Sequence, residues 1–192
     1  MEKERLKPRE METILNKKSG LQGITEKFTD RRDIQIAASK GDRRAELCID
    51  MEAYRLKKYI GSYYAVLGRM DAVVFTAGVG ELSHIIRERV LTGLEELGIK
   101  LDLKRNRASK TRDAETVISA VDSPVKVFVI PTDEELVMTE DTYALLQGTY
   151  DIHTRFSYSF QKRDYVNKER AEALERSLKD KLELKEVIAP IP

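Results

Sequence analysis

Residues 71–83 read DAVVFTAGVGELS, and this stretch decides the fold. Its first part, 71–77, is a short and unbroken apolar run, which is typical of a strand buried on both faces of an α/β sheet. The segment 76–81 then interrupts the run with two glycines. Residues 83–97 restore apolar side chains at helical spacing, and Gly98 is a typical helix stop. We therefore predict a strand, a glycine turn and a helix in this order.

The stretch downstream repeats this arrangement. A short extended piece near 99–102 and a charged stretch at 103–114 precede two more predicted strands, 116–120 and 126–130. Pro131 ends the second of these strands. Thr132 and Glu135 have the Ser/Thr-x-x-Glu spacing of a capping box, so we expect a helix that begins there and continues to Gly148. Two strand–turn–helix units place the chain in the α/β class.

Upstream of the deciding stretch, three helices are predicted. They cover 9–18, 31–39 and, with Asp42 as the N-cap, 43–68, whereas 21–30 is predicted to be a loop. After Gly148 the pattern changes, because aromatic residues crowd a helix-poor stretch and 167–184 is a highly charged helix candidate. We expect one domain over 1–148 and a C-terminal extension over 149–192.

The composition excludes several classes of protein. The 192 residues carry 34 Lys and Arg against 33 Asp and Glu, a net charge of +1, which gives no electrostatic argument for a nucleic-acid binder or a membrane-surface protein. The longest apolar stretches fall far short of the roughly 20 residues that a membrane helix needs. The N-terminus carries no signal-like apolar segment, so we expect a cytoplasmic protein.

The few cysteines and histidines restrict the metal chemistry. Cys48 is the single cysteine, and His84 and His153 are the two histidines, so neither a Cys/His zinc site nor a Cys-His dyad is expected within one chain. We assign no role to these three residues. Any metal is expected to be held by oxygen.

The glycine turn is the first candidate for ligand binding. Glycines between a strand and a helix let backbone N–H groups approach a ligand, and the helix N-terminus adds a partial positive charge, which suits a nucleotide. The spacing matches neither Gly-x-Gly-x-x-Gly nor the Gly-x4-Gly-Lys phosphate loop. Plain turn chemistry therefore remains an alternative reading of this segment.

The residue order in several segments points to a known family more specifically than the apolar pattern and the turn chemistry do. VFTAGVGE at 74–81 resembles the adenosine motif of acetate kinases, and four other blocks resemble the same family in the same order. They are NKKSGLQGI at 16–24, DRRD at 30–33, LEELGIKLD at 94–102 and IPTDEEL at 130–136. The resemblance covers about 10–147 and corresponds to the C-terminal part of an enzyme about twice this length.

The resemblance implies a fold within the superfamily of acetate and sugar kinases, heat-shock chaperones and actin. This fold is α/β, a ribonuclease H-like or actin-like ATPase C-terminal domain with a mixed central sheet flanked by helices. Residues 1–148 are then the acetate kinase C-terminal nucleotide-binding domain. Residues 149–192 are expected to form a helical extension beyond the family's usual end.

The resemblance also implies an activity, namely reversible transfer of the γ-phosphoryl group of ATP to acetate, which gives acetyl phosphate and ADP. ATP or ADP and Mg²⁺ are the implied cofactors, with Glu134 as the magnesium-linked residue. The implied nucleotide-binding residues form two segments: Asp30, Arg31 and Arg32, and Gly78, Val79, Gly80, Glu81 and Leu82. Arginine donors suit phosphate or ribose oxygens, and Mg²⁺ prefers carboxylate and water.

Each implied site residue has a structural alternative. Asp30 and Arg32 suit an N-cap and a surface ion pair, and the adjacent acids Glu134 and Glu135 suit a helix start. The capping box assigns Glu135 to the helix and leaves Glu134 free for a ligand. Leu82 stands where the family motif has asparagine, so one hydrogen bond near the nucleotide is lost and we expect weaker nucleotide binding.

The family's acetate pocket, phosphate-contacting loop and transition-state groups have no matching segment in this sequence. We therefore assign no catalytic residue to this chain and expect it to be inactive without an N-terminal half, which would supply the site for acetate or a related short carboxylate. The expected partners are that half or a second copy of the chain in a homodimer. The alternative is a non-catalytic ATP/ADP-binding or dimerisation module derived from the family.

Overall fold

A computed structural model describes residues 3–189, so the ends of both expected domains, 1–2 and 190–192, lie outside the described residues. The chain divides into two compact units that meet between Gly68 and Arg69. The described part of 149–192 belongs to the same unit as the sheet. The structural division thus falls at Gly68, and a functional boundary at Gly148 stays a prediction.

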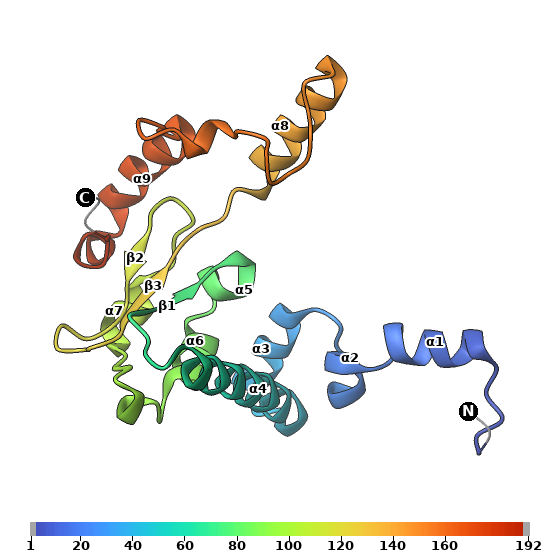
Figure 1. Cartoon of the computed structure of the whole chain (residues 1–192). Coiled ribbons are helices and arrows are strands. Elements are labelled where there is room, and N and C mark those ends of the chain that lie inside the picture. Colours follow the sequence, from blue (N-terminus) through green and yellow to red (C-terminus); the bar gives the residue numbers. More distant parts are fainter. Residues whose placement is uncertain (1–2, 190–192) are drawn as a thin grey trace. The chain divides into compact units, whose positions relative to one another are not determined.

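The first unit is helical (Figure 1) and contains α1 (Pro8–Lys17), α2 (Gly20–Thr25), α3 (Arg31–Ser39) and α4 (Arg43–Leu67). The three predicted helices are confirmed, and α2 corrects the predicted loop at 21–30. Asp42 caps α4 as predicted, since its side chain accepts from the backbone N–H groups of Arg44 and Ala45. Helix α3 packs on α4. The buried apolar side chains of these two helices are Ile34, Ala45, Cys48, Ile49 and Ala53.

The second unit is built on a three-stranded mixed sheet in the order β1-β3-β2 (Figure 1). Strand β1 (Ala72–Phe75) runs parallel to β3 (Lys126–Val129), and β2 (Thr116–Val117) runs antiparallel to β3. The predicted mixed sheet is therefore confirmed. The predicted burial of the first strand on both faces is wrong, because β1 lies at the sheet's edge and Val74 is 50% exposed. The buried strand is the central one, β3, through Val127 and Val129.

Short helices replace the predicted glycine turn and the single long helix that follows it. The glycine segment is a short helix, α5 (Ala77–Leu82), which Ala77 enters at a φ of +58°. The region 83–97 divides into α6 (His84–Leu91) and a 3-10 turn, η1 (Glu95–Leu97), because Gly93 between them has a φ of +80°. Part of the charged stretch forms α7 (Leu103–Ala108), with Asp102 as its N-cap.

The last part of the chain contains α8 (Glu134–Gln147), η2 (Ser159–Gln161), α9 (Lys168–Asp180) and η3 (Leu182–Glu186). Helix α8 is present as predicted, but its capping box is wrong, because Asp133 is the N-cap and accepts from the backbone N–H of Leu136 at 3.1 Å. The charged helix at 167–184 is confirmed as α9. The buried apolar core of this unit includes Ile86, Val90, Leu91, Ile99, Ile118, Val127, Val129, Leu184 and Val187. Among residues 3–189, no helix is both long and apolar enough to cross a membrane.

Candidate functional site

The glycine segment follows directly after the end of β1. A Cβ atom at Gly80 would lie 3.3 Å from the backbone carbonyl carbon of Phe75, so the close return of α5 onto the strand favours glycine here. Gly78 has open space around it. Val79 and Leu82 are 39% and 48% exposed. The segment therefore presents an open surface formed by Gly78 and these two apolar side chains.

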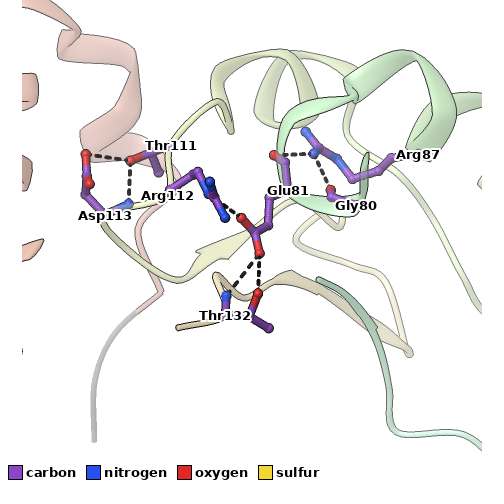
Figure 2. A network of polar contacts seen from close by, with 7 residues as sticks. All are labelled: Gly80, Glu81, Arg87, Thr111, Arg112, Asp113 and Thr132. Carbon is purple, nitrogen blue, oxygen red and sulfur yellow. Dashed lines mark hydrogen bonds and ion pairs between the residues drawn. The ribbon is translucent and has the colours of Figure 1, made fainter. Parts of the chain in front are cut away.

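Glu81 faces the opposite way, into the protein. Its side chain is fully buried, and one carboxylate oxygen accepts from the backbone N–H and the hydroxyl of Thr132, at 3.0 and 3.1 Å (Figure 2). The other oxygen accepts from Nε of Arg112 at 2.9 Å. These donors occupy both oxygens of the Glu81 carboxylate, so the side chain is committed to contacts within the protein. It ties α5 to the turn before α8.

Arg87 on α6 holds the same segment from its other end. Its Nη1 donates to the carbonyl oxygens of Gly80 and Glu81, at 2.7 and 2.8 Å (Figure 2). Its Nε donates to the side-chain oxygen of Asn106, and Nη2 donates to the carbonyls of Asn106 and Ser109. The five N–H groups of the guanidinium thus have five acceptors. Burial lowers the pKa of Arg87 to about 10, which leaves it protonated at neutral pH.

Sequence reasoning missed Arg87, although a sign of it was present. In the helical pattern that begins at Ser83, positions 86, 87, 90 and 91 form one face, and Arg87 is the charged residue on that face. An arginine among apolar residues at this spacing must find buried partners, because an unpaired buried charge is very costly. The carbonyl oxygens of Gly80 and Glu81, at the end of α5, are among these partners.

Glu134 lies in the first turn of α8, two residues after Thr132, which is bonded to Glu81. Its side chain is exposed and takes part in no hydrogen bond or ion pair within residues 3–189. Glu134 also lines an open cavity of about 320 Å³, together with Thr132 and Asp133, whereas Glu135 does not. Helix capping therefore does not distinguish Glu134 from Glu135, because Asp133 is the cap. The cavity does distinguish them, because Glu134 lines it and Glu135 does not.

The segment 30–32 lies in the first unit. Asp30 is the N-cap of α3 and accepts from the backbone N–H of Arg32 at 2.7 Å, while Nη2 of the Arg32 side chain donates to it at 2.6 Å. The hydrogen bond from this guanidinium lowers the pKa of Asp30 to about 2. The Arg32 side chain is 86% exposed. The cap and the surface ion pair are thus both present.

Arg31 points differently from its neighbour. Its side chain is 13% exposed, and Nε lies 2.9 Å from a carboxylate oxygen of Glu52 on α4. The structure therefore does not bring all three residues of this segment to one surface. Asp30 and Arg32 are open to a ligand, and Arg31 joins α3 to α4.

The comparisons with known proteins identify the class of protein to which this arrangement belongs. The arrangement consists of the mixed sheet, the short helix after β1 and the exposed acid Glu134 at the start of α8. The family model of the Acetokinase family matches residues 1–140, and the chain belongs to this family. It is 60% identical over 168 residues to the acetate kinase of Geobacter sulfurreducens, which covers 88% of this chain and 40% of that protein. It is 57% identical over 182 residues to the acetate kinase of Treponema pallidum, which covers 94% of this chain and 41% of that protein.

Two solved structures agree with this assignment. The Porphyromonas gingivalis acetate kinase has a TM-score of 0.68 and 42% identity over 76% of this chain and 36% of that one. The Francisella tularensis propionate kinase has a TM-score of 0.59 and 35% identity over 68% of this chain and 32% of that one. The chain thus spans about 40% of the length of the curated relatives it matches.

The comparisons also bear on the extension. A match that covers 94% of the chain includes most of 149–192, so the Treponema pallidum enzyme shares much of this stretch. The extension is therefore not foreign to the family, and it is a feature that at least some relatives have.

Proposed function

We propose that the chain is the C-terminal, nucleotide-binding part of an acetate kinase. In the proposed reaction an oxygen of the acetate carboxylate attacks the γ-phosphorus of ATP, the bond from this phosphorus to the bridging oxygen breaks, and ADP leaves as acetyl phosphate forms. The observation that carries the proposal is the tie between Glu81 and Thr132. It holds the glycine segment beside the start of α8, so that the two together form one side of the proposed nucleotide site.

In this proposal the open surface of the glycine segment contacts the adenosine. The contact is formed by the backbone of Gly78 and the apolar side chains of Val79 and Leu82, while Gly80 allows the segment to return closely onto the strand. Glu81 holds the segment in place. In the first unit, Asp30 and Arg32 bind the nucleotide through the exposed guanidinium, which supplies fixed donors to phosphate or ribose oxygens. Arg31 supports them by joining α3 to α4.

Glu134 fits a magnesium ion as a single protein ligand. Mg²⁺ keeps several waters and is commonly bound by one or two carboxylates together with substrate phosphates. Residues 3–189 contain no group of three Asp, Glu, His or Cys residues that could hold a metal, so a site built on the phosphates suits this chain. When bound, the metal would neutralise charge on the transferred phosphoryl group.

The proposal requires a second part of the enzyme. Phosphoryl transfer depends on positioning both substrates and stabilising the charge of the transition state. We assign the binding of acetate, or of a related short carboxylate, and the transition-state groups to the portion of the relatives that this chain does not match. The isolated chain is therefore expected not to turn over.

A chimera tests the proposal. This chain replaces the matching region of the Geobacter sulfurreducens acetate kinase, and ADP release is measured with ATP and acetate. The chimera should turn over at a kinase-like rate, roughly 1–100 per second, and the isolated chain should not. A folded but inactive chimera, or comparable turnover by the isolated chain, would contradict the proposal.

A dimerisation module is the second candidate, because large apolar side chains are exposed along α4. They are Leu47, Met51, Tyr54, Tyr59, Tyr63 and Val66. Leu47, Met51 and Tyr54 share one face of the helix, and an exposed apolar face of this kind often marks a protein–protein interface. Light scattering should show a dimer of the chain, and Tyr54→Glu should produce a monomer. A monomeric parent chain at micromolar concentration would remove this candidate.

A further inference from the structure

The extension binds along the acidic side of α8. After Gly148 the chain runs back along this helix (Figure 1). The hydroxyl of Tyr158 donates to Asp141 at 2.8 Å, and the backbone N–H of Ser159 donates to Glu140 at 2.9 Å, with a further bond from the Ser159 hydroxyl to the same carboxylate. Tyr158 is only 4% exposed. The extension therefore holds α8 through two carboxylates in its middle.

A third attachment lies at the start of α8. Nδ2 of Asn167 donates to one carboxylate oxygen of Asp133 at 3.0 Å. The other oxygen of Asp133 accepts from the backbone N–H of Leu136, and Oδ1 of Asn167 accepts from the backbone N–H of Arg170. Each residue is the N-cap of its helix, so one hydrogen bond joins the caps of α8 and α9. This bond lies one residue away from Glu134.

The same segment also forms part of the cavity beside Glu134. Besides Asn167, the extension contributes Phe160, Tyr165 and Arg170 to the lining. Nη2 of Arg170 is 3.2 Å from a carboxylate oxygen of Glu115. Of the five acids between positions 133 and 141, the extension engages Asp133, Glu140 and Asp141. The part of the extension that the structure describes, up to residue 189, leaves Glu134 and Glu135 unengaged.

We propose that Asn167 is a positioning residue for Glu134. By holding the Asp133 cap, its amide fixes the first turn of α8 and keeps the Glu134 carboxylate directed toward the cavity. This inference rests on the proposed function, in which Glu134 carries the magnesium ion. It assigns the extension a role in metal binding that 1–148 alone would lack.

The two polar atoms of Asn167 allow a sharp test. Asn167→Ser keeps a side-chain acceptor suited to the α9 cap and removes the amide donor to Asp133 without adding a charge. Ser159→Ala is the matched control, because it removes an attachment of the extension to the middle of α8, far from the first turn. Both variants are made in the chimera and in the 192-residue chain.

The first readout is the magnesium requirement of the chimera. Asn167→Ser should raise the Mg²⁺ concentration for half-maximal rate by up to about tenfold, because loss of a partner bonded directly to a metal ligand costs about 10–100-fold and Asn167 acts on Glu134 through the Asp133 cap. The kcat at saturating Mg²⁺ should stay close to that of the parent, and Ser159→Ala should keep the parent's requirement. An unchanged requirement in an active Asn167→Ser chimera overturns the inference, whereas an inactive parent chimera overturns the proposed function.

The second readout does not depend on activity. Hydrogen–deuterium exchange of the 192-residue chain should become faster at the first-turn amides of α8 in Asn167→Ser, while the first turn of α9 keeps its protection. Equal exchange at α8 in variant and parent overturns the inference, whatever the activity. Faster exchange at both helix starts also overturns it, because Asn167 would then act as an ordinary cap.

Discussion

The Asp30–Arg32 pair and the Glu81–Arg87 region place charged side chains in opposite environments. Asp30 and Arg32 pair at the surface, with the arginine 86% exposed, whereas Glu81 and Arg87 are fully buried and bonded to backbone and side-chain groups from several segments. Exposed ion pairs contribute little to stability, because water competes for both charges. Buried networks determine the structure and leave no donor for a ligand. The exposed pair is therefore suited to binding and the buried network to support.

The largest expected effect is that of Arg87→Ala. It leaves the carbonyls of Gly80, Glu81 and Ser109 without their donor. Because each buried acceptor left unsatisfied costs about 1–3 kcal/mol, the free energy of unfolding should fall by several kcal/mol. Urea denaturation measures the change. Arg32→Ala is the control and should leave stability nearly unchanged. Equal losses in the two variants would remove the distinction between the regions.

Arg32→Ala should have the next largest effect, on binding instead of stability. In the chimera, loss of a charge-assisted hydrogen bond should weaken ADP binding by roughly ten- to hundredfold. Isothermal titration calorimetry provides the dissociation constant, with Lys40→Ala as a control substitution at the end of the same helix. Unchanged ADP affinity would assign Asp30 and Arg32 to helix capping alone.

A smaller effect separates the acids at the start of α8. Asp133→Ala removes the observed cap and should lower the free energy of unfolding by about 0.5–2 kcal/mol. Glu135→Ala should leave stability nearly unchanged, since its side chain caps nothing. Thermal unfolding of the two variants decides this. A larger loss in Glu135→Ala would restore the capping box of Thr132 and Glu135 that the structure rejects.

The smallest effect is expected at alkaline pH. Burial and the Asp141 carboxylate raise the pKa of Tyr158 from 10 to about 12. The unfolded chain therefore loses this proton before the folded one does, so the stabilisation by neutral Tyr158 is complete below pH 10 and is lost between pH 10 and about 12. The stability difference between the parent and Tyr158→Phe, followed by urea denaturation across this range, should shrink as the pH rises. A constant difference would show that Tyr158 ionises in the folded and unfolded chains alike.

Rules that use only nearby residues in the sequence predicted correctly the features that nearby residues determine, such as helix caps. Asp30 and Asp42 were recognisable as caps because their partners lie two or three residues away. Thr132 satisfied the same rule but is not the cap, because its hydroxyl is bonded to Glu81, which lies 51 residues earlier. The burial of β1 failed for a related reason, since an apolar run does not reveal which strand lies at the edge of a sheet.

The site shows the same limit. The resemblance named Glu134 and the glycine segment, and the structure adds the bond from the glycine segment to Thr132, two residues before Glu134. It also shows the carboxylate of Glu81 bonded to Thr132 and Arg112. The attachment of Asn167 to Asp133 could not be predicted, because 34 residues separate the two and either side chain alone is an ordinary helix cap. Ligand contacts at Asp30, Arg32 and Glu134 stay predictions.

The five acceptors of Arg87 come from four positions, 80, 81, 106 and 109, on both sides of α6 along the chain. A guanidinium loses its hydration when it is buried, and this cost is offset only when hydrogen-bond acceptors are already in place around it. We therefore expect these bonds to form late in folding, after α5, α6 and α7 have assembled. A peptide that carries only residues 71–83 would lack this arginine and its distant acceptors, and would not retain the geometry that the whole unit imposes on its glycines.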